Sequence, residues 1–220
     1  MKREIITTDD GSTSFRIPEW GESFHSTHGA IQETKHVFIK NGLALFSNQN
    51  ISILEIGFGT GLNALATLAE QPHLNLNVHY ETIEAYPLSW QEASQMNYCE
   101  LLQQPALAPL FAKMHQCPWN EEVTLNSHFI LKKRKQFFQE INDLSQFDLI
   151  YFDAFGAQVQ PELWQEDIFQ KMYNALKTNG ILVTYAAKGS VRRAMTACGF
   201  TVERLQGPPG KREMLRATKA

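Results

Sequence analysis

The chain has 220 residues, 43% of them hydrophobic, which is enough for one well-packed domain with a small extension. Its formal net charge of −3 argues against a surface that is basic throughout, as many nucleic-acid-binding proteins have. The first residues lack the apolar core of a secretion signal, and no apolar run is long enough to span a bilayer. Three widely spaced cysteines fit neither a disulfide framework nor a zinc site. We therefore expect a cytoplasmic protein that does not associate with a membrane.

The N-terminal part of the chain is predicted to be an extension of a larger domain. Its expected elements are a hairpin over 5–17 with Asp10-Gly11 at the turn, a polar loop over 21–29 and a helix over 30–40. We place the boundary after residue 45, which gives an extension over 1–45 and a main domain over 46–220.

From residue 51 onward, predicted strands and helices alternate. The strands cover 51–56, 78–83, 128–131, 147–152, 181–185, 201–205 and 213–217. The helices cover 62–70, 135–141, 165–176 and 190–198, and another begins near 87. We expect Asn179-Gly180 to cap the helix over 165–176. The alternation predicts a Rossmann-like α/β fold with a doubly wound, mostly parallel sheet, and the last two strands predict an antiparallel edge.

The first strand of the main domain leads into a glycine-rich loop. The strand ends at Glu55, and three glycines follow at alternate positions, Gly57, Gly59 and Gly61. Glycine allows a sharp turn into a helix and lets a ligand lie against bare backbone, while N–H groups at the helix start favour its polar end. A dinucleotide fingerprint needs Gly or Ala where Leu62 stands. The pattern E-x-G-x-G-x-G instead resembles the S-adenosylmethionine loop of class I methyltransferases.

Two later strands end in carboxylates. Glu84 stands 23 residues after Gly61, where it can accept both ribose hydroxyls of an adenosine. Asp153 follows a nearly all-apolar strand and can accept a proton or a hydrogen bond from an incoming nucleophile. The structural alternatives are a surface glutamate that opens a loop and an aspartate that caps a turn. We expect Glu55 to be nearly buried and to hold the loop or meet the ammonium end of the methionine moiety.

Other candidate sites have weaker support. His25, His28 and His36 lack a fourth ligand and the spacing of a metal site, so we expect no metal. Phe155 and Trp164 suit either stacking on a base or packing in a lid or core, and the sequence leaves both open. Ser-His-Asp hydrolase chemistry has no nucleophile elbow.

Basic residues gather near the C-terminus. From Lys188 onward, eight basic residues stand against two acidic ones. The basic ones are Lys188, Arg192, Arg193, Arg204, Lys211, Arg212, Arg216 and Lys219. A second run, Lys132-Lys133-Arg134-Lys135, lies mid-chain. Each run alone is most simply a solvated face, but the two together make a directed basic patch a reasonable hypothesis.

Four segments resemble the methyltransferase domain of the bacterial MnmC-type tRNA-modifying enzymes, in particular its stand-alone versions. They are the loop and helix over 24–38, the glycine loop over 55–63, the pair 152–155 and 161–164, and the C-terminal runs 190–193, 199–200 and 210–214. The C-terminal segment is the most specific, because methyltransferases in general lack Val-Arg-Arg followed by Gly-Lys-Arg-Glu-Met.

The resemblance implies methyl transfer from S-adenosylmethionine to the exocyclic amine of 5-aminomethyl-(2-thio)uridine at the tRNA wobble position. S-adenosylhomocysteine is the implied product, and no metal is required. Two-domain relatives carry a flavin-dependent oxidase domain that first unveils the amine. This chain has no room for that domain, so we expect methylation alone, without FAD. The implied partners are the tRNA anticodon region and, functionally, the enzyme that installs the aminomethyl group; a monomer fits, although the sequence does not decide the oligomeric state.

Functional residues of the family carry over onto matching positions. The implied cofactor-binding residues are Glu33, Glu55, Gly57, Gly59, Thr60, Gly61, Asn63, Glu84, Ala85 and Asp153, and Asp153 is also the implied catalytic residue. The implied tRNA-binding residues are Phe24, Phe155, Lys188, Arg192, Arg193, Lys211 and Arg212. In one place the chain departs from the family, which often holds the adenine amine with an acidic residue where this chain has Lys132-Lys133-Arg134-Lys135. Adenine must then be recognised by backbone or by another residue.

Two other kinds of function remain open. A small-molecule methyltransferase, or a polyamine-synthase-like aminopropyltransferase, would share the loop and the acidic strand ends without needing the C-terminal basic residues. A catalytically silent RNA-binding or partner module would keep the loop only as structure.

Overall fold

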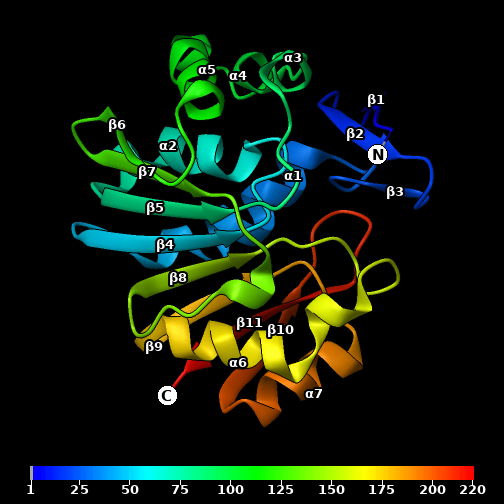
Figure 1. Ribbon diagram of the computed structural model, residues 1–220, viewed down its shortest axis with the longest axis vertical. Helices are drawn as coiled ribbons and strands as arrows, with labels where there is room; N and C mark the ends of the chain where they lie inside the picture. The colour runs from blue at the N-terminus through cyan, green and yellow to red at the C-terminus, as the bar shows by residue number, and fades with distance from the viewer. Residues whose placement is uncertain (1) are drawn as a thin grey trace.

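The computed structural model describes residues 2–220 and has one large sheet of eight strands in the order β10-β11-β9-β8-β4-β5-β7-β6 (Figure 1). The strands are β4 (Asn50–Ile56), β5 (Asn77–Ile83), β6 (Glu122–Asn126), β7 (Phe129–Arg134), β8 (Phe147–Phe152), β9 (Leu176–Thr184), β10 (Phe200–Gln206) and β11 (Glu213–Lys219). The five central strands run parallel, whereas β6 at one edge and β11 and β10 at the other run antiparallel to their neighbours. The predicted fold class, with its antiparallel C-terminal edge, is confirmed.

Helices cover both faces of this sheet. One face packs against α1 (Ala30–Thr34), which continues as the π-helix η1 (Lys35–Lys40), and against α2 (Leu62–Leu74) and α5 (Ala108–Gln116); the other face packs against α6 (Glu166–Ala175) and α7 (Gly189–Ala197). The short elements are α3 (Trp90–Ala93), α4 (Tyr98–Leu101), η2 (Leu43–Leu45), η3 (Pro105–Leu107), η4 (Phe138–Glu140) and η5 (Pro161–Trp164). Because both faces are covered, β4 and β5 are buried over most of their length, which explains their apolar runs.

A second, three-stranded sheet of β1 (Glu4–Thr7), β2 (Thr13–Ile17) and β3 (Glu22–Ser23) lies to one side of the large sheet (Figure 1). The helical segment that follows it does not stand apart, because Ala30 and Phe38 belong to the same hydrophobic cluster as Leu65 of α2. The predicted extension therefore contributes both a separate small sheet and a part of the main core.

The strand order of the large sheet reverses between β4 and β8. From β4 the chain adds β5 and then β7 on one side, and it returns to place β8 on the other side. The segments that leave β4 and β8 diverge, and this divergence opens a crevice at the carboxyl ends of the strands. The ends of β5 and β9 flank the same edge.

Two predicted local structures are wrong. The helix predicted over 135–141 is a single 3-10 turn, η4, whose Glu140 carboxylate accepts the Phe137 N–H at 2.9 Å. Ile141 is the one apolar residue of that segment that is fully buried, so a longer helix would have no face to pack. Asn179 and Gly180 do not cap a helix. They lie within β9, where Asn179 has a φ of 63° and the register with β8 shifts.

The first three residues of the mid-chain basic run lie in β7, which ends at Arg134, and Lys135 follows the strand. Successive side chains of a strand point to opposite faces, and here Lys133 is fully buried whereas Lys132 and Arg134 pair with Glu81 at 3.6 and 3.3 Å. Three of the four basic residues are thus unavailable to the hypothesised basic patch. The neighbouring strand β6 is absent from the sequence-based prediction, since only one of its residues, Leu125, is buried.

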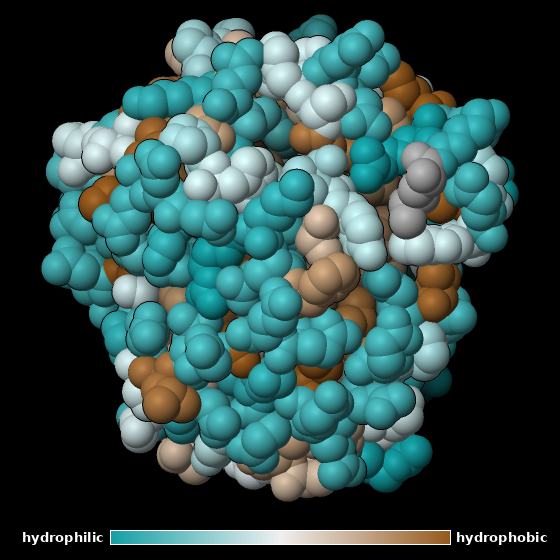
Figure 2. All heavy atoms as spheres, in the orientation of Figure 1, coloured by the Kyte–Doolittle hydropathy of each residue, from teal (hydrophilic) through white to brown (hydrophobic). Residues whose placement is uncertain are grey.

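The surface is mainly polar on the side that Figure 2 shows, where hydrophobic residues occur in small, separate groups. Within residues 2–220, no helix combines the length and the apolar character that crossing a bilayer requires. The three cysteines are free thiols.

Candidate functional site

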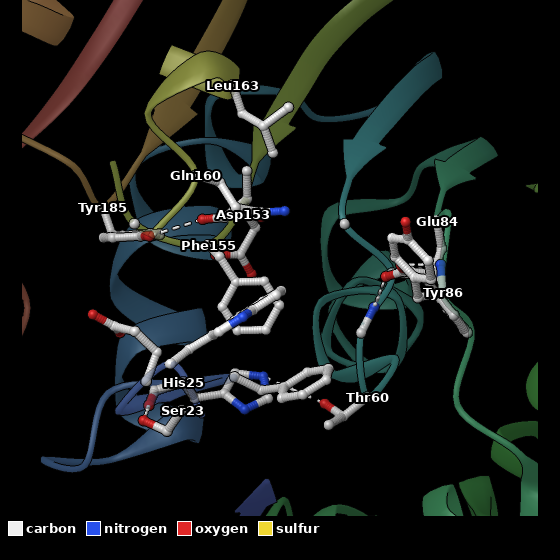
Figure 3. A pocket seen from close by; sticks show the side chains of 18 of the residues that line it. Ser23, His25, Thr60, Glu84, Tyr86, Asp153, Phe155, Gln160, Leu163 and Tyr185 are labelled. Atoms are coloured by element: carbon white, nitrogen blue, oxygen red, sulfur yellow. Dashed lines mark hydrogen bonds between the residues drawn. The ribbon is translucent and has the colours of Figure 1, made fainter. Parts of the chain in front are cut away.

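A cavity of about 600 Å³ lies at the carboxyl edge of the large sheet, within the size range of small-molecule sites (roughly 300–1,000 Å³). Its walls come from the glycine loop, the residues after β5, β7, β8 and β9, and the segment 20–27 around β3. Figure 3 divides the labelled side chains between two sides, with Glu84 and Tyr86 on one and Asp153, Phe155 and Tyr185 on the other.

At two of its glycines, the glycine loop runs too close to its neighbours to carry a side chain. Gly57 has a φ of +95°, and a Cβ there would lie 2.8 Å from the backbone oxygen of Asp153. Gly61 has a φ of +76°, and its Cβ would lie 2.8 Å from Nε2 of His115. Both positions therefore require glycine, and at both the loop presents only backbone before it leads into α2.

Glu84 stands at the end of β5. Its Oε2 accepts the N–H of Gly59 at 3.1 Å, and its Oε1 accepts the N–H of Tyr86 at 2.9 Å. The two bonds fix the carboxylate against the glycine loop. Because a carboxylate has about four acceptor positions, capacity remains for two hydroxyl donors from a ligand in the cavity.

The cavity wall beyond Glu84 is built from residues that follow β5 and β7. They are Ala85, Tyr86, Phe137, Phe138 and Gln139. The Tyr86 and Phe137 rings meet edge to face with centroids 6.0 Å apart. Where the family often has an acidic residue, this wall offers aromatic faces, backbone groups and the Gln139 amide.

Asp153 lies at the end of β8, across the cavity from Glu84 (Figure 3). Its Oδ2 accepts a hydrogen bond from the Asn63 side chain at 2.8 Å, and the Asn63 oxygen accepts the Thr34 hydroxyl at 2.9 Å. Burial raises the pKa of Asp153 to about 7; the Glu33 carboxylate adds to the shift, while the Asn63 bond and the Lys211 ammonium oppose it. A carboxyl group that titrates near neutrality is suited to accepting a proton at physiological pH.

Glu55 lies behind the glycine loop and does not line the cavity. Within residues 2–220, neither of its oxygens has a hydrogen-bond partner, and the hydroxyls of Tyr80 and Thr82 on β5 are also unpartnered. Burial raises the pKa of Glu55 to about 8, and the charge of Asp153 adds to the shift. Its carboxyl group is therefore mostly protonated at neutral pH, and its predicted role stays a prediction.

Three aromatic rings form a cluster in the wall of the cavity. Phe155 meets Phe24 and Trp20 edge to face, with centroids 5.1 and 5.2 Å apart, and all three line the cavity. Trp164 is buried, packs on Phe152 and donates its Nε1 hydrogen to the Phe155 oxygen at 2.7 Å. Of the two aromatic residues that the sequence left open, Phe155 faces the cavity, and Trp164 is mainly part of the core.

A bare glycine loop between two strand-end carboxylates fits a nucleoside cofactor that carries a charged tail, and a family match identifies which one. The model of a family described as S-adenosyl-L-methionine-dependent methyltransferases matches residues 89–220, more than half of the chain. The chain belongs to this methyltransferase family.

Individual relatives agree with the resemblance that the motifs predict. The tRNA 5-methylaminomethyl-2-thiouridine biosynthesis bifunctional protein MnmC of Methylobacillus flagellatus is 29% identical over 214 residues, which cover 89% of this chain and 32% of the relative. The chain thus spans about a third of the length of the curated relatives it matches. The structure of MnmC2 from Aquifex aeolicus superposes with a TM-score of 0.80 at 26% identity, covering 100% of this chain and 70% of that one. Spermidine synthase from Thermotoga maritima shares the fold, with a TM-score of 0.60 at 15% identity over 99% of this chain and 68% of that one.

Most of the predicted site residues of this methyltransferase converge on the one cavity. Those that line it are Phe24, Glu33, Gly57, Gly59, Thr60, Asn63, Glu84, Ala85, Asp153, Phe155 and Lys211. Those that do not are Glu55, Gly61, Lys188, Arg192, Arg193 and Arg212. Of these, Lys188 and Arg212 line a shallower adjoining hollow that shares Gly156, Gln158, Tyr185 and Lys211 with the cavity.

Seven of the eight C-terminal basic residues of the methyltransferase divide into two groups, and the eighth, Lys219, donates its Nζ hydrogen to the Leu176 oxygen at 2.7 Å. Arg204 and Arg216 pair with Glu213 and Glu203, and Lys211 pairs with Glu33. Within residues 2–220, no carboxylate pairs with the second group, Lys188, Arg192, Arg193 and Arg212, of which all but the half-buried Arg192 are exposed. The second group leaves positive charge beside the hollow.

Tyr185 and His25 line the cavity but are absent from the sequence-based prediction. Tyr185 stands just after β9 and donates its hydroxyl to the Ala154 oxygen at 2.8 Å. The sequence could have identified Tyr185 as a site residue, because it follows a strand end as Glu84 and Asp153 do. His25 contacts the Ser14 hydroxyl at 2.8 Å, and burial lowers its pKa to about 4; the sequence analysis considered its side chain only as a metal ligand.

The three histidines that the sequence analysis considered as metal ligands each have a different contact. His25, His28 and His36 contact Ser14, Asp9 and the Gln206 oxygen respectively, so they do not converge. In the described part of the chain, no three histidine, cysteine or carboxylate side chains are grouped so that they could hold a metal ion.

Proposed function

We propose that this methyltransferase transfers a methyl group to the primary amine of 5-aminomethyl-(2-thio)uridine at the wobble position of tRNA. The observation that carries the proposal is the position of Asp153, held by Asn63 at the floor of the cavity and opposite Glu84. The relatives named for 5-methylaminomethyl-2-thiouridine biosynthesis in tRNA support the substrate. Since the chain spans about a third of those relatives, only the methylation step is proposed for it. A tRNA substrate accords with the cytoplasmic location expected from the sequence.

The chemistry follows from the protonation state of the amine. When bound, S-adenosylmethionine supplies a methyl carbon on a sulfonium, so that attack by a neutral nitrogen forms the N–C bond and releases S-adenosylhomocysteine. A primary alkylamine has a pKa of about 10 and arrives mostly as a cation. The Asp153 carboxylate accepts one ammonium proton, which restores the nitrogen lone pair. Asn63 holds the carboxylate in the orientation that this transfer requires.

The remaining walls position the two substrates. Glu84 is placed to accept the ribose hydroxyls of the cofactor, and Phe24 and Phe155 stand where the pyrimidine ring would enter. Fixing reacting atoms in attack geometry can supply about 7–11 kcal/mol of rate enhancement. Positioning therefore provides most of the acceleration, and Asp153 provides a proton acceptor.

The test is methyl transfer to a panel of acceptors. Labelled S-adenosylmethionine is incubated with the protein and with tRNA that carries the aminomethyl group, the same tRNA without it, or putrescine. We expect label only in the aminomethyl-bearing tRNA. Label in putrescine alone would favour a small-molecule methyltransferase. In a parallel incubation of putrescine with decarboxylated S-adenosylmethionine, transfer of the aminopropyl group to putrescine with release of methylthioadenosine would favour an aminopropyltransferase, which the shared fold does not exclude.

A catalytically silent RNA-binding module makes a different prediction. Such a module would bind tRNA without binding S-adenosylhomocysteine. Isothermal titration with S-adenosylhomocysteine separates the two cases, and we expect stoichiometric binding.

A further inference from the structure

Lys211 was expected on the tRNA-binding surface, yet its ammonium group lies inside the methyltransferase cavity. The Nζ atom forms an ion pair with Oε1 of Glu33 and lies 3.9 Å from the centroid of the Tyr185 ring. All three residues line the cavity together with Asp153. The ammonium therefore has a carboxylate on one side and an aromatic face on another, which are the two groups that best hold an alkylammonium ion.

The walls around this ammonium are held in place by other parts of the protein. Glu33 is buried, and its second oxygen accepts the Ser26 N–H at 3.0 Å. The Tyr185 hydroxyl donates to the Ala154 oxygen at 2.8 Å, next to Asp153. Neither wall depends on Lys211 for its position, so the pocket for a cation would persist if the Lys211 ammonium moved away.

Lys211 itself is carried by a short turn. The turn joins β10 to β11 and is closed by the hydrogen bonds Gly207 N–H to Arg212 oxygen at 3.1 Å and Lys211 N–H to Pro208 oxygen at 2.9 Å. The Lys211 side chain is about 31% exposed, and the residue borders both the cavity and the adjoining hollow. A change of rotamer can therefore carry the ammonium from the cavity toward Lys188 and Arg212.

The proposed substrate presents the same chemical group, a primary amine on a flexible methylene. We infer that Glu33 and Tyr185, with Asp153, form the subsite for the aminomethyl group, and that Lys211 occupies this subsite until the substrate displaces it. Once displaced, Lys211 joins Lys188 and Arg212 as a contact for RNA phosphate. The inference rests on the proposed function and changes two predicted roles: Glu33 binds the substrate amine rather than the cofactor, and Lys211 exchanges between two sites.

The test compares the same substitution on a nucleoside and on tRNA. Lys211→Met keeps the side-chain stem and removes the charge. Titrations in the presence of S-adenosylhomocysteine use 5-aminomethyluridine, with 5-hydroxymethyluridine as the uncharged control. We expect the variant to bind 5-aminomethyluridine at least tenfold more tightly than the wild type, because the internal competitor is gone, and to bind the control nucleoside equally. For tRNA we expect weaker binding and a log–log salt dependence shallower by about 0.7, as loss of one phosphate contact predicts.

Tighter binding of 5-aminomethyluridine together with weaker binding of tRNA distinguishes displacement of Lys211 from a purely structural role of this residue. Equal or weaker binding of 5-aminomethyluridine by Lys211→Met, with wild-type tRNA methylation intact, would overturn the inference while leaving the proposed function standing. Absence of tRNA methylation by the wild type would count against the proposed function instead. A measurement on the wild type avoids any misfolding of the variant. The ¹⁵N resonance of the Lys211 ammonium should shift when 5-aminomethyluridine and S-adenosylhomocysteine are added. A resonance that stays unchanged at saturation contradicts displacement.

Discussion

The Asn63 side chain donates a 2.8 Å hydrogen bond to Asp153, which ties the first turn of α2 to the end of β8. Thr34 donates to the oxygen of the same amide, so the nitrogen must face the carboxylate. The contact thus joins the helix that follows β4 to the end of β8, on the two sides of the reversal of strand order, and both residues line the cavity. In the proposed mechanism, this contact aims the proton acceptor.

Replacing the acceptor should separate catalysis from cofactor binding. We expect Asp153→Asn to lower turnover of aminomethyl-bearing tRNA by roughly 10²–10⁴-fold, the usual contribution of a general base. Affinity for S-adenosylhomocysteine should stay within a few-fold, because Asp153 lies across the cavity from Glu84, the carboxylate proposed to bind the ribose. Single-turnover kinetics and calorimetry measure the two quantities. Wild-type turnover in the variant would remove Asp153 from the mechanism.

The rate should depend on pH through the same group. Because burial raises the pKa of Asp153 to about 7, the carboxylate is protonated and unable to accept a proton in acid, and it ionises as the pH rises. We expect kcat/KM for tRNA to increase through about pH 7 and then to level off. Profiles recorded from about pH 5.5 to 9 for the wild type and Asp153→Asn check this. A limb near pH 7 that persists in the variant would assign the titration to another group.

Glu84 should matter for the cofactor rather than for the methyl acceptor. Loss of its carboxylate removes the bonds to the Gly59 and Tyr86 N–H groups and the proposed ribose contacts. We expect Glu84→Ala to weaken S-adenosylhomocysteine binding by about 10–100-fold, equivalent to roughly 1.4–2.7 kcal/mol. Glu121→Ala, at an exposed position outside the cavity, is the matched control and should bind normally. Equal affinities for the two variants would contradict the ribose-side assignment.

Buried Glu55 gives a prediction about stability. Its pKa is raised from 4.5 in the unfolded chain to about 8 in the fold, so the folded chain keeps a proton that the unfolded chain releases over that range. Stability contributed by this group is therefore full below about pH 4.5 and declines as the pH rises to about 8. Glu55→Gln stays neutral, so its advantage in unfolding free energy over the wild type should grow to a few kcal/mol across this window. Urea unfolding at pH 5, 6.5 and 8 measures it, and a pH-independent difference would refute the shifted titration.

The unpaired C-terminal arginines should bind RNA, whereas the paired ones should not. Arg193 is exposed, and within residues 2–220 no carboxylate pairs with it; Arg216 pairs with Glu203 at 2.9 Å. We expect Arg193→Ala to weaken tRNA binding several-fold and to reduce the salt dependence, as loss of a phosphate contact predicts. Arg216→Ala is the control and should change binding little. If both variants bind tRNA like the wild type, this face does not contact the RNA.

Site residues that directly follow a strand could be predicted from the sequence, whereas contacts between residues far apart in the sequence could not. Glu84, Asp153 and the glycine loop each follow a strand, and parallel strands bring their carboxyl ends to one edge, so local patterns predict their convergence. The role of Tyr185 was open to the same reasoning. The contacts of His25 and the ion pair of Lys211 with Glu33 join residues distant in sequence, and no periodicity encodes them.

The failures in the fold have equally local causes. In the segment over 135–141, spaced apolar residues suggested a helix, but Phe137 remains half-exposed against Tyr86 and a single turn suffices. The Asn179-Gly180 pair is a common helix cap, yet here it makes a strand bulge, because β9 starts directly after α6. Counting basic residues likewise overestimated the free positive charge of the run over 132–135, because the count did not reveal that Lys133 is buried and that Arg134 is paired with Glu81.

The most direct test of the central claim is to locate the transferred methyl group by mass spectrometry. Aminomethyl-bearing tRNA is incubated with the protein and S-adenosylmethionine that carries a trideuterated methyl group, digested to nucleosides and fragmented. The account predicts a single trideuteromethyl group on the exocyclic nitrogen of the wobble nucleoside, lost when Asp153 is replaced by Asn. Label on the base ring, on a ribose or at another tRNA position, or no label at all, would contradict it.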